Sequence, residues 1–321
     1  LVYKLYNRIY KPYKIQCSLI TIFLLYLLGI QLSEDYGISW DENVRRIGAK
    51  SHAKEVCQFF GIKHDIFQNI PSVKENNHSW TGPYGMIYEF PALIGEAIIG
   101  SNNTKAIFEL RHKIIFTFHF IGILAFFLLA KEIFKSTKKS LFATFIYSMH
   151  PRIFAHSFFN PKDIIFLALV SISLFLISKY FNSKNIKWLI YSSVFIGFSM
   201  SSRIVGIYLP FLFAATIILK SVFYEHGKIN TYTQSTLKCI SILLVSFITM
   251  FVVTPYYWNN TIPHFIETFE MAKNFPWLNN VFFFGKNTPA PELPWYYLIV
   301  SFLITTPLIN IFFFDFWYFY L

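Results

Sequence analysis

The sequence predicts an all-α, polytopic membrane protein: a bundle of transmembrane helices whose long first external loop contains interfacial helices. Hydrophobic residues make up 55% of the 321 residues and charged residues only 14%, whereas about a quarter of a soluble domain is charged. The apolar residues fall in long runs, which excludes one large soluble core. Lys and Arg gather at the ends of these runs, a pattern that sets membrane orientation.

Eight apolar runs approach the ~20 residues that a helix needs to cross the hydrocarbon of a bilayer. They cover residues 15–34, 113–131, 140–156, 163–180, 187–202, 204–220, 238–255 and 294–314. The third and fifth are short, so we expect them to be tilted or partly re-entrant. Without an internal repeat or a low-complexity linker, residues 1–321 form a single membrane domain. The chain begins with Leu and stops in an aromatic run, so we expect a fragment truncated at its C-terminus.

The distribution of basic residues predicts a cytoplasmic N-terminus. Lys and Arg are frequent in the N-terminal segment and in the loops after the second, fourth and sixth spans, and such loops face the cytoplasm. Residues 35–112 are then the first external loop and residues 256–293 the last, and the turn at 156–163 is also external. Because the net charge of +11 is spread over span ends, it favours membrane lipids as partners and excludes nucleic acid. The three cysteines are widely separated, which implies no disulfide framework.

The first external loop is predicted to hold two helices that lie in the membrane interface. Residues 42–60 place apolar side chains near one helical face and cations such as Arg45 and Arg46 on the others, which suits contact of the cations with headgroups. A second run, Phe90 to Ile99, is too short to cross the bilayer. The segment between these helices, around residues 76–85, is rich in Asn, Gly and Pro and predicts turns.

Two acidic motifs are the candidate reactive groups. Trp40-Asp41-Glu42 follows the first span, and Asn160-Pro161-Lys162-Asp163 precedes the fourth. Ionisable groups are costly near a bilayer, so acids at its edge usually have a task. The topology brings both motifs to the same membrane face. A carboxylate there can take a proton from an attacking hydroxyl; the alternative is that Asp41 and Asp163 only cap the helices that follow them.

Cations surround the second motif and suit a phosphate group. Arg152, His156 and Lys162 lie close to Asp163 in the sequence, and Arg203 interrupts the apolar sequence between spans five and six. Arg203 either reaches for the interface or points into a cavity. Arg111 and His112 can be interpreted in the same two ways, as residues that reach the interface or as residues that point into a cavity. Neither the His nor the acidic residues have dependable metal-ligand spacing, so no cofactor is predicted, and a divalent metal stays open.

The last external loop is rich in aromatic residues and proline, including Pro294-Trp295-Tyr296-Tyr297. Trp and Tyr favour the headgroup level, so an aromatic belt is one interpretation. The other is a stacking wall for a sugar ring or a lipid groove, because amphipathic rings serve both purposes.

With these motifs in this order, the chain resembles the polytopic glycosyltransferases of the GT-C class. An Asp-Glu pair opens a long external loop, a second acid lies at the outer junction of spans three and four, and Leu293-Pro294-Trp295-Tyr296-Tyr297 precedes Thr305-Thr306-Pro307. The likeness is closest to the bacterial branch related to protein O-mannosyltransferases and the lipid A aminoarabinose transferase.

The resemblance implies transfer of a hexose or pentose from a polyprenyl-phosphate donor to an acceptor hydroxyl, with inversion, outside the cytoplasm. The acceptor is a protein, a lipid or a polysaccharide, and the location is the bacterial inner membrane, in the cell envelope. The resemblance implies that Asp41 is the base, that Glu42 positions it, and that Asp163 orients the acceptor or the sugar or shares the base role. The lipid phosphate would be neutralised by four cations: Arg152, His156, Lys162 and Arg203. Trp295 and Tyr296 would contact the substrate.

Two other function classes fit a polytopic protein with polar residues. A transporter or lipid flippase places charges near the bilayer midplane or shows inverted repeats. A non-catalytic scaffold that binds a lipid-linked sugar tolerates loss of the Asp41 carboxylate. The charges of this chain gather at one face and no repeat is present, so the sequence favours the enzyme.

Overall fold

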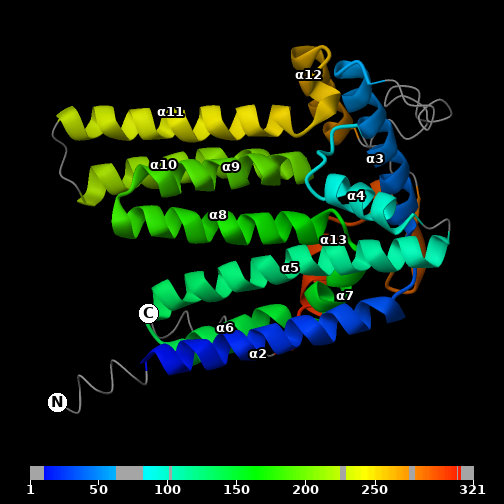
Figure 1. Ribbon diagram of the computed structural model, residues 1–321, viewed down its shortest axis with the longest axis horizontal. Coiled ribbons are helices and arrows are strands. Elements are labelled where there is room, and N and C mark those ends of the chain that lie inside the picture. The colour runs from blue at the N-terminus through cyan, green and yellow to red at the C-terminus, as the bar shows by residue number, and fades with distance from the viewer. Residues whose placement is uncertain are drawn as a thin grey trace.

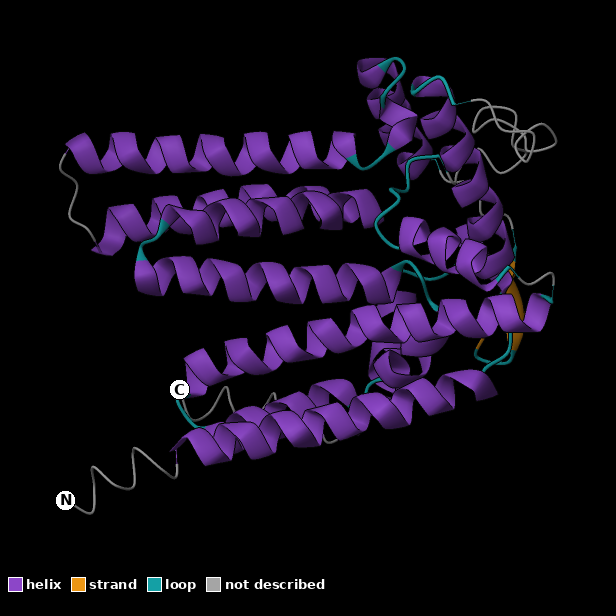
Figure 2. Ribbon diagram, viewed as in Figure 1, coloured by secondary structure: helices purple, strands orange, loops and turns teal. Residues whose placement is uncertain are grey.

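The computed structural model describes residues 11–62, 82–100, 103–224, 229–274, 279–308 and 310–311. These residues form a bundle of helices (Figures 1 and 2), so the predicted all-α polytopic class is confirmed. A small antiparallel hairpin near the C-terminus adds two short strands, β1 (Asn280–Phe283) and β2 (Lys286–Pro289).

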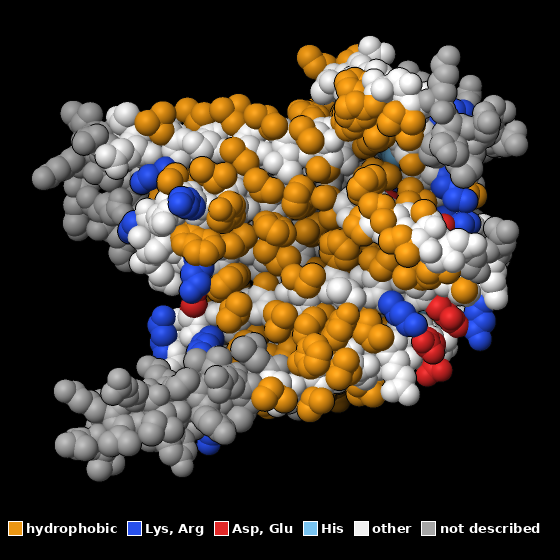
Figure 3. Space-filling view, viewed as in Figure 1, with side chains coloured by type: hydrophobic (Ala, Val, Ile, Leu, Met, Phe, Trp, Pro, Cys, Tyr) orange, Lys and Arg blue, Asp and Glu red, His pale blue; other side chains and the backbone are white. Residues whose placement is uncertain are grey.

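The helices that make up the body of the bundle run side by side (Figure 1). They are α2 (Lys11–Leu32), α5 (Thr104–Phe134), α6 (Thr137–Ser148), α8 (Asp163–Ser183), α9 (Ile186–Ser202), α10 (Tyr208–Tyr224) and α11 (Ile229–Val252). In the described residues, four stretches are long and apolar enough to cross a membrane: Thr104–Phe134, Asp163–Ser183, Ile204–Phe223 and Tyr232–Val252. Hydrophobic side chains cover the face of the bundle in Figure 3, with Lys and Arg toward its two ends.

Other helices gather at one end of the bundle, on the right in Figure 1. They are α3 (Trp40–Phe59), α4 (Glu89–Ile99), α7 (Pro151–Phe159) and α12 (Thr261–Lys273). We call this the site end. Single turns of 3-10 helix connect elements there and elsewhere: η2 (Ser33–Asp35), η5 (Ile204–Ile207), η6 (Pro255–Tyr257) and η7 (Ala290–Glu292). Helix α13 (Tyr297–Thr305) follows the hairpin.

Small and hydroxylated residues let the central helices pack closely. A Cβ added at Gly122 of α5 would lie 2.7 Å from the Cα of Ala168 in α8, so these two helices touch through their backbones, as is common in membrane bundles. The Ser192 hydroxyl of α9 donates to the Ser173 carbonyl of α8 at 3.0 Å. The Ser246 hydroxyl of α11 donates to Ser193 of α9 at the same distance. These contacts join α5 to α8, α8 to α9 and α9 to α11.

The third predicted span, residues 140–156, is two helices. Helix α6 ends at Ser148 and α7 begins at Pro151, because proline has no amide hydrogen and is tolerated only in the first turn of a helix. The 12 residues of α6 extend about 18 Å, less than the ~30 Å of hydrocarbon. Of the predicted span 294–314, α13 covers Tyr297–Thr305, and residues 309 and 312–321 lie outside the described part.

The predicted helices of the first external loop are confirmed as α3 and α4, with two corrections. The N-cap of α3 is Ser39 rather than Asp41. The cations Arg45 and Arg46 do not reach for headgroups: both form ion pairs with carboxylates of α4. Burial of a charge is tolerated when it is paired. The helical pattern of residues 42–60 could not show that the carboxylates that pair with Arg45 and Arg46 lie on α4.

Candidate active site

The N-terminus of α3 is fixed by Glu42. Its carboxylate accepts the Ser39 backbone amide at 2.6 Å, which forms a capping box. The other oxygen of Glu42 lies 2.8 Å from Nε2 of His112 on α5, and the Glu42 side chain is only 1% exposed. Glu42 therefore holds the start of α3 against α5, and its side chain is buried.

Asp41, one residue earlier, faces outward and meets the second acidic motif. Its carboxylate lies 2.6 Å from the ammonium group of Lys162 and is 42% exposed. Lys162 is the residue before the first turn of α8. The prediction that the two motifs meet is thus confirmed by direct contact at the site end.

Asp163 is held from two sides. A guanidinium nitrogen of Arg203, the residue between α9 and η5, lies 2.5 Å from its carboxylate. The Asn160 amide donates to the carboxylate at 3.0 Å. The Asn160 side-chain oxygen also accepts the backbone amides of Lys162, at 3.1 Å, and Asp163, at 2.9 Å. Asn160 therefore caps the turn, and the Asp163 carboxylate is bound by both Arg203 and the Asn160 amide.

Tyr84 lies between the two acid–cation pairs, a position that the sequence did not predict. The Lys162 ammonium lies 5.6 Å from the centre of its ring, and the Arg45 guanidinium lies 4.5 Å from that centre. Both distances suit attraction of a cation to an aromatic face. Burial lowers the pKa of Arg203, but Asp163 and the Tyr84 hydroxyl outweigh this and raise the pKa, so the hydroxyl lies near Arg203. Tyr84 thus lies beside the cations paired with Asp41 and with Asp163.

Gly85 explains how this ring is placed. Its amide donates to the Ser201 carbonyl at 2.8 Å, and the Met86 amide donates to the Val253 carbonyl at 2.9 Å. A Cβ at Gly85 would come within 2.7 Å of the Ser201 side chain, so only glycine fits. The turn at residues 82–88 is therefore pinned to the ends of α9 and α11. The sequence predicted a turn here. The only other feature of the sequence that could have indicated Tyr84 is its position between Pro83 and Gly85.

Behind Tyr84 a buried network of ion pairs ties α3, α4 and α5 together. Arg111 pairs with Glu89, and it contacts Glu96 at 2.7 Å. Arg45 lies 3.2 Å from Glu89, and Arg46 lies 2.7 Å from Glu96. Burial raises the pKa of Glu96, but its hydrogen bonds from Arg46 and Arg111 outweigh this and lower the pKa below its ordinary value. The network therefore keeps Glu96 ionised and fixes α3 relative to the membrane helices.

Two further predicted site residues, Arg152 and His156, lie on α7. His156 of α7 accepts the Asn160 amide at 2.9 Å, and burial, together with the charge of Arg152, lowers its pKa. Arg152 is exposed on the same helix.

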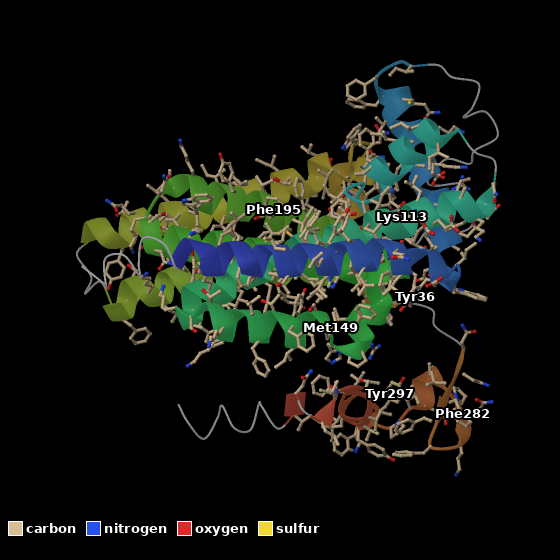
Figure 4. The ribbon with its side chains drawn as sticks, turned by 60° about the horizontal axis from the view of Figure 1, so that its bottom comes forward. Tyr36, Lys113, Met149, Phe195, Phe282 and Tyr297 are labelled. Carbon is tan, nitrogen blue, oxygen red and sulfur yellow. The ribbon has the colours of Figure 1, made fainter. Side chains whose placement is uncertain are left out.

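Trp295 and Tyr296 lie on the C-terminal segment, which Figure 4 shows as a layer of its own around Tyr297 and Phe282. Their ring contacts in the described residues are with each other and with Phe283, not with the acidic pairs. Across the described ranges, no three His, Cys, Asp or Glu side chains gather as a metal site.

Comparison with known families decides the class. The family described as dolichyl-phosphate-mannose-protein mannosyltransferases matches residues 94–258, just over half of the chain. The chain belongs to this family. The match runs from α4 to the residue after η6 and includes Arg152, Lys162, Asp163 and Arg203. No curated protein and no solved structure matches the chain. As a member of the mannosyltransferase family, the protein is a membrane glycosyltransferase, which confirms the GT-C resemblance at the level of class.

Proposed function

We propose that the protein transfers a sugar, with inversion, from a polyprenyl-phosphate donor to an acceptor hydroxyl, and that the site end faces away from the cytoplasm. One observation carries the proposal. Two acids from distant parts of the chain, Asp41 and Asp163, are each paired with a cation, and both cations lie beside Tyr84. The family name supplies the class of donor, a mannose carried on a polyprenyl phosphate.

The two cations are suited to the leaving phosphate. When the bond between sugar and phosphate breaks, the phosphate keeps the electron pair, and fixed positive charge stabilises it. Lys162 and Arg203 come from neighbouring helix ends and meet at Tyr84. The phosphate of a bound donor competes with Asp41 for Lys162 and with Asp163 for Arg203. Arg152, exposed on α7, adds positive charge at this end.

Asp41 is the better placed base. A phosphate bound to Lys162 frees the Asp41 carboxylate, which takes the proton of the acceptor hydroxyl while its oxygen attacks the anomeric carbon. The bond to the phosphate oxygen breaks as the new glycosidic bond forms, on the opposite side of the sugar. Asp163, also held by Asn160, stays in place to orient the sugar or the acceptor.

An apolar groove beside the site suits the hydrocarbon tail of the carrier. It has a volume of about 410 Å³ and lies between α3, the start of α4 and the end of α11. Its walls include Val56, Cys57, Met86, Phe90, Val252 and Trp258. Burial of prenyl carbons there contributes roughly 0.8 kcal/mol per CH₂ group, so the tail supplies affinity while the polar pairs act on the headgroup.

The test is transfer by the purified protein in liposomes. Polyprenyl phosphates carrying different radiolabelled sugars are supplied with peptide, lipid and polysaccharide acceptors. We expect label to leave the donor with release of polyprenyl phosphate, and Asp163→Asn to lower the rate more than tenfold while the donor still binds. If the wild type consumes no donor and instead moves lipid or solute across the vesicle wall, the enzyme proposal is wrong and the polar pairs belong to a transport path.

A further inference from the structure

Helix α12 carries an apolar stripe that no other described part of the chain covers. Ile262, Ile266 and Phe269 are 72%, 54% and 40% exposed, and residues spaced by four and three lie on one face of a helix. Lys273 continues the same face in the last turn. The opposite face is buried: Nδ1 of His264 donates to the Tyr256 carbonyl at 2.6 Å, and the Thr268 hydroxyl lies 3.2 Å from the Tyr257 hydroxyl.

The stripe continues the apolar outer surface of α11. That helix is a candidate membrane span, and its exposed residues Leu244, Ile248 and Val252 recur every four positions up to its end. The chain then turns at η6, and α12 runs across the end of α11 and projects to the side of the bundle (Figure 1). A helix with this direction lies along the membrane surface rather than through it.

The C-terminal end of α3 extends the same surface. Phe59 and Phe60 are exposed, and both rings contact Trp258 edge-on, with ring centres 5.1 and 6.3 Å apart. Trp258 follows η6 and directly precedes the loop that starts α12. The end of α3 and α12 therefore project together beside α11 (Figure 1), with the apolar groove between α3, α4 and α11 next to them.

We infer that α12 and the C-terminal end of α3 form a platform that inserts into the bilayer leaflet at the site end. Interfacial helices bury an apolar face about 5–10 Å into the boundary between headgroups and acyl chains. Ile262, Ile266 and Phe269 supply that face, and Lys273 reaches the phosphates of the headgroups. The acidic Glu270 is one residue after Phe269, about 100° around the helix, and so lies at the edge of the stripe. Glu267 accepts the Tyr256 hydroxyl at 2.7 Å, so neither acid lies at the centre of the apolar face. The platform holds the groove at the depth of the acyl chains.

The experiment measures the depth of spin labels in the complete chain. In a background where Cys17, Cys57 and Cys239 are replaced by alanine, single cysteines are introduced as Ile266→Cys, Glu270→Cys and Leu244→Cys. The labelled proteins are reconstituted into phosphatidylcholine–phosphatidylglycerol vesicles. Collisions of each label with oxygen, which concentrates in lipid, and with a nickel chelate, which stays in water, are compared. Position 244 is the lipid reference and position 270 the matched control on the same helix.

We expect the ratio of oxygen to nickel accessibility at position 266 to approach that at 244 and to exceed that at 270 several-fold. A ratio at 266 equal to that at 270 places the stripe in water and overturns the inference. Low accessibility to both reagents at 266 shows that protein covers the stripe, which also overturns it. Because all three substitutions are at exposed positions, folding is preserved, and circular dichroism of each labelled protein verifies this.

Discussion

Replacing Asp41 by Asn separates catalysis from stability. The change keeps the shape of the side chain and removes one charge of the pair with Lys162. The Asp41 side chain is 42% exposed and the Lys162 side chain 12% exposed, so we expect loss of the pair to cost about 1 kcal/mol of folding free energy, the upper value for a surface salt bridge. Loss of a general base lowers the rate about 10²–10⁴-fold, or about 2.7–5.4 kcal/mol at 1.36 kcal/mol per factor of ten.

The assay is transfer of labelled sugar in liposomes, with the melting temperature and donor binding measured on the same samples. Glu34→Gln is the matched control, because Glu34 pairs with Lys113 at 2.6 Å and is 52% exposed, outside the site. We expect both variants to melt close to the wild type and only Asp41→Asn to lose transfer. Transfer by Asp41→Asn within threefold of the wild type, or a loss matched by Glu34→Gln, would refute base catalysis by Asp41.

Three further substitutions have expected outcomes. Arg111→Met leaves Glu89 and its neighbours with unbalanced buried charge and costs about 3–5 kcal/mol of folding free energy, measured as a lower melting temperature; an unchanged temperature contradicts this. Gly85→Ala adds a Cβ that would clash with Ser201, so it pushes the turn and Tyr84 away from α9. We expect transfer to fall at least tenfold with little change in the melting temperature, and full activity would refute the requirement for glycine at this position. Burial and the charge of Arg152 lower the pKa of His156 from 6.5, so the neutral form is favoured. The contribution of neutral His156 to transfer is present above pH 6.5 and is lost as the pH falls through the lowered pKa. His156→Gln should therefore remove the fall in transfer rate on the acid side of the pH profile, and an unchanged fall would show that His156 does not cause it.

Much of the helical arrangement could be predicted because it depends on local composition. The length of an apolar run and the position of cations are properties of short stretches, and α5, α8 and α11 follow from them. The break between α6 and α7 depends on one residue, Pro151. The hydrophobicity of residues 140–156 concealed it, since proline in the first turn of a helix interrupts the backbone without changing the apolar composition.

The site was predictable in part. Asp41, Lys162 and Asp163 could be identified because charged residues at the edge of a bilayer are conspicuous. Tyr84 could not be, because its role depends on the turn that Gly85 pins against Ser201, a contact between segments more than a hundred residues apart. The helical pattern of α3 likewise suggested that its cations face lipid headgroups. Only the fold shows that α4 supplies their carboxylate partners.

The most direct test of the central claim is a structure of the protein with a polyprenyl-phosphonate mannose that cannot react, determined by electron cryomicroscopy in a lipid nanodisc. We predict that the phosphonate lies between Lys162 and Arg203, each having exchanged its carboxylate for the ligand, with the anomeric carbon facing Asp41. A headgroup bound at the opposite end of the bundle, or at the site end without contact to either cation, would contradict the account.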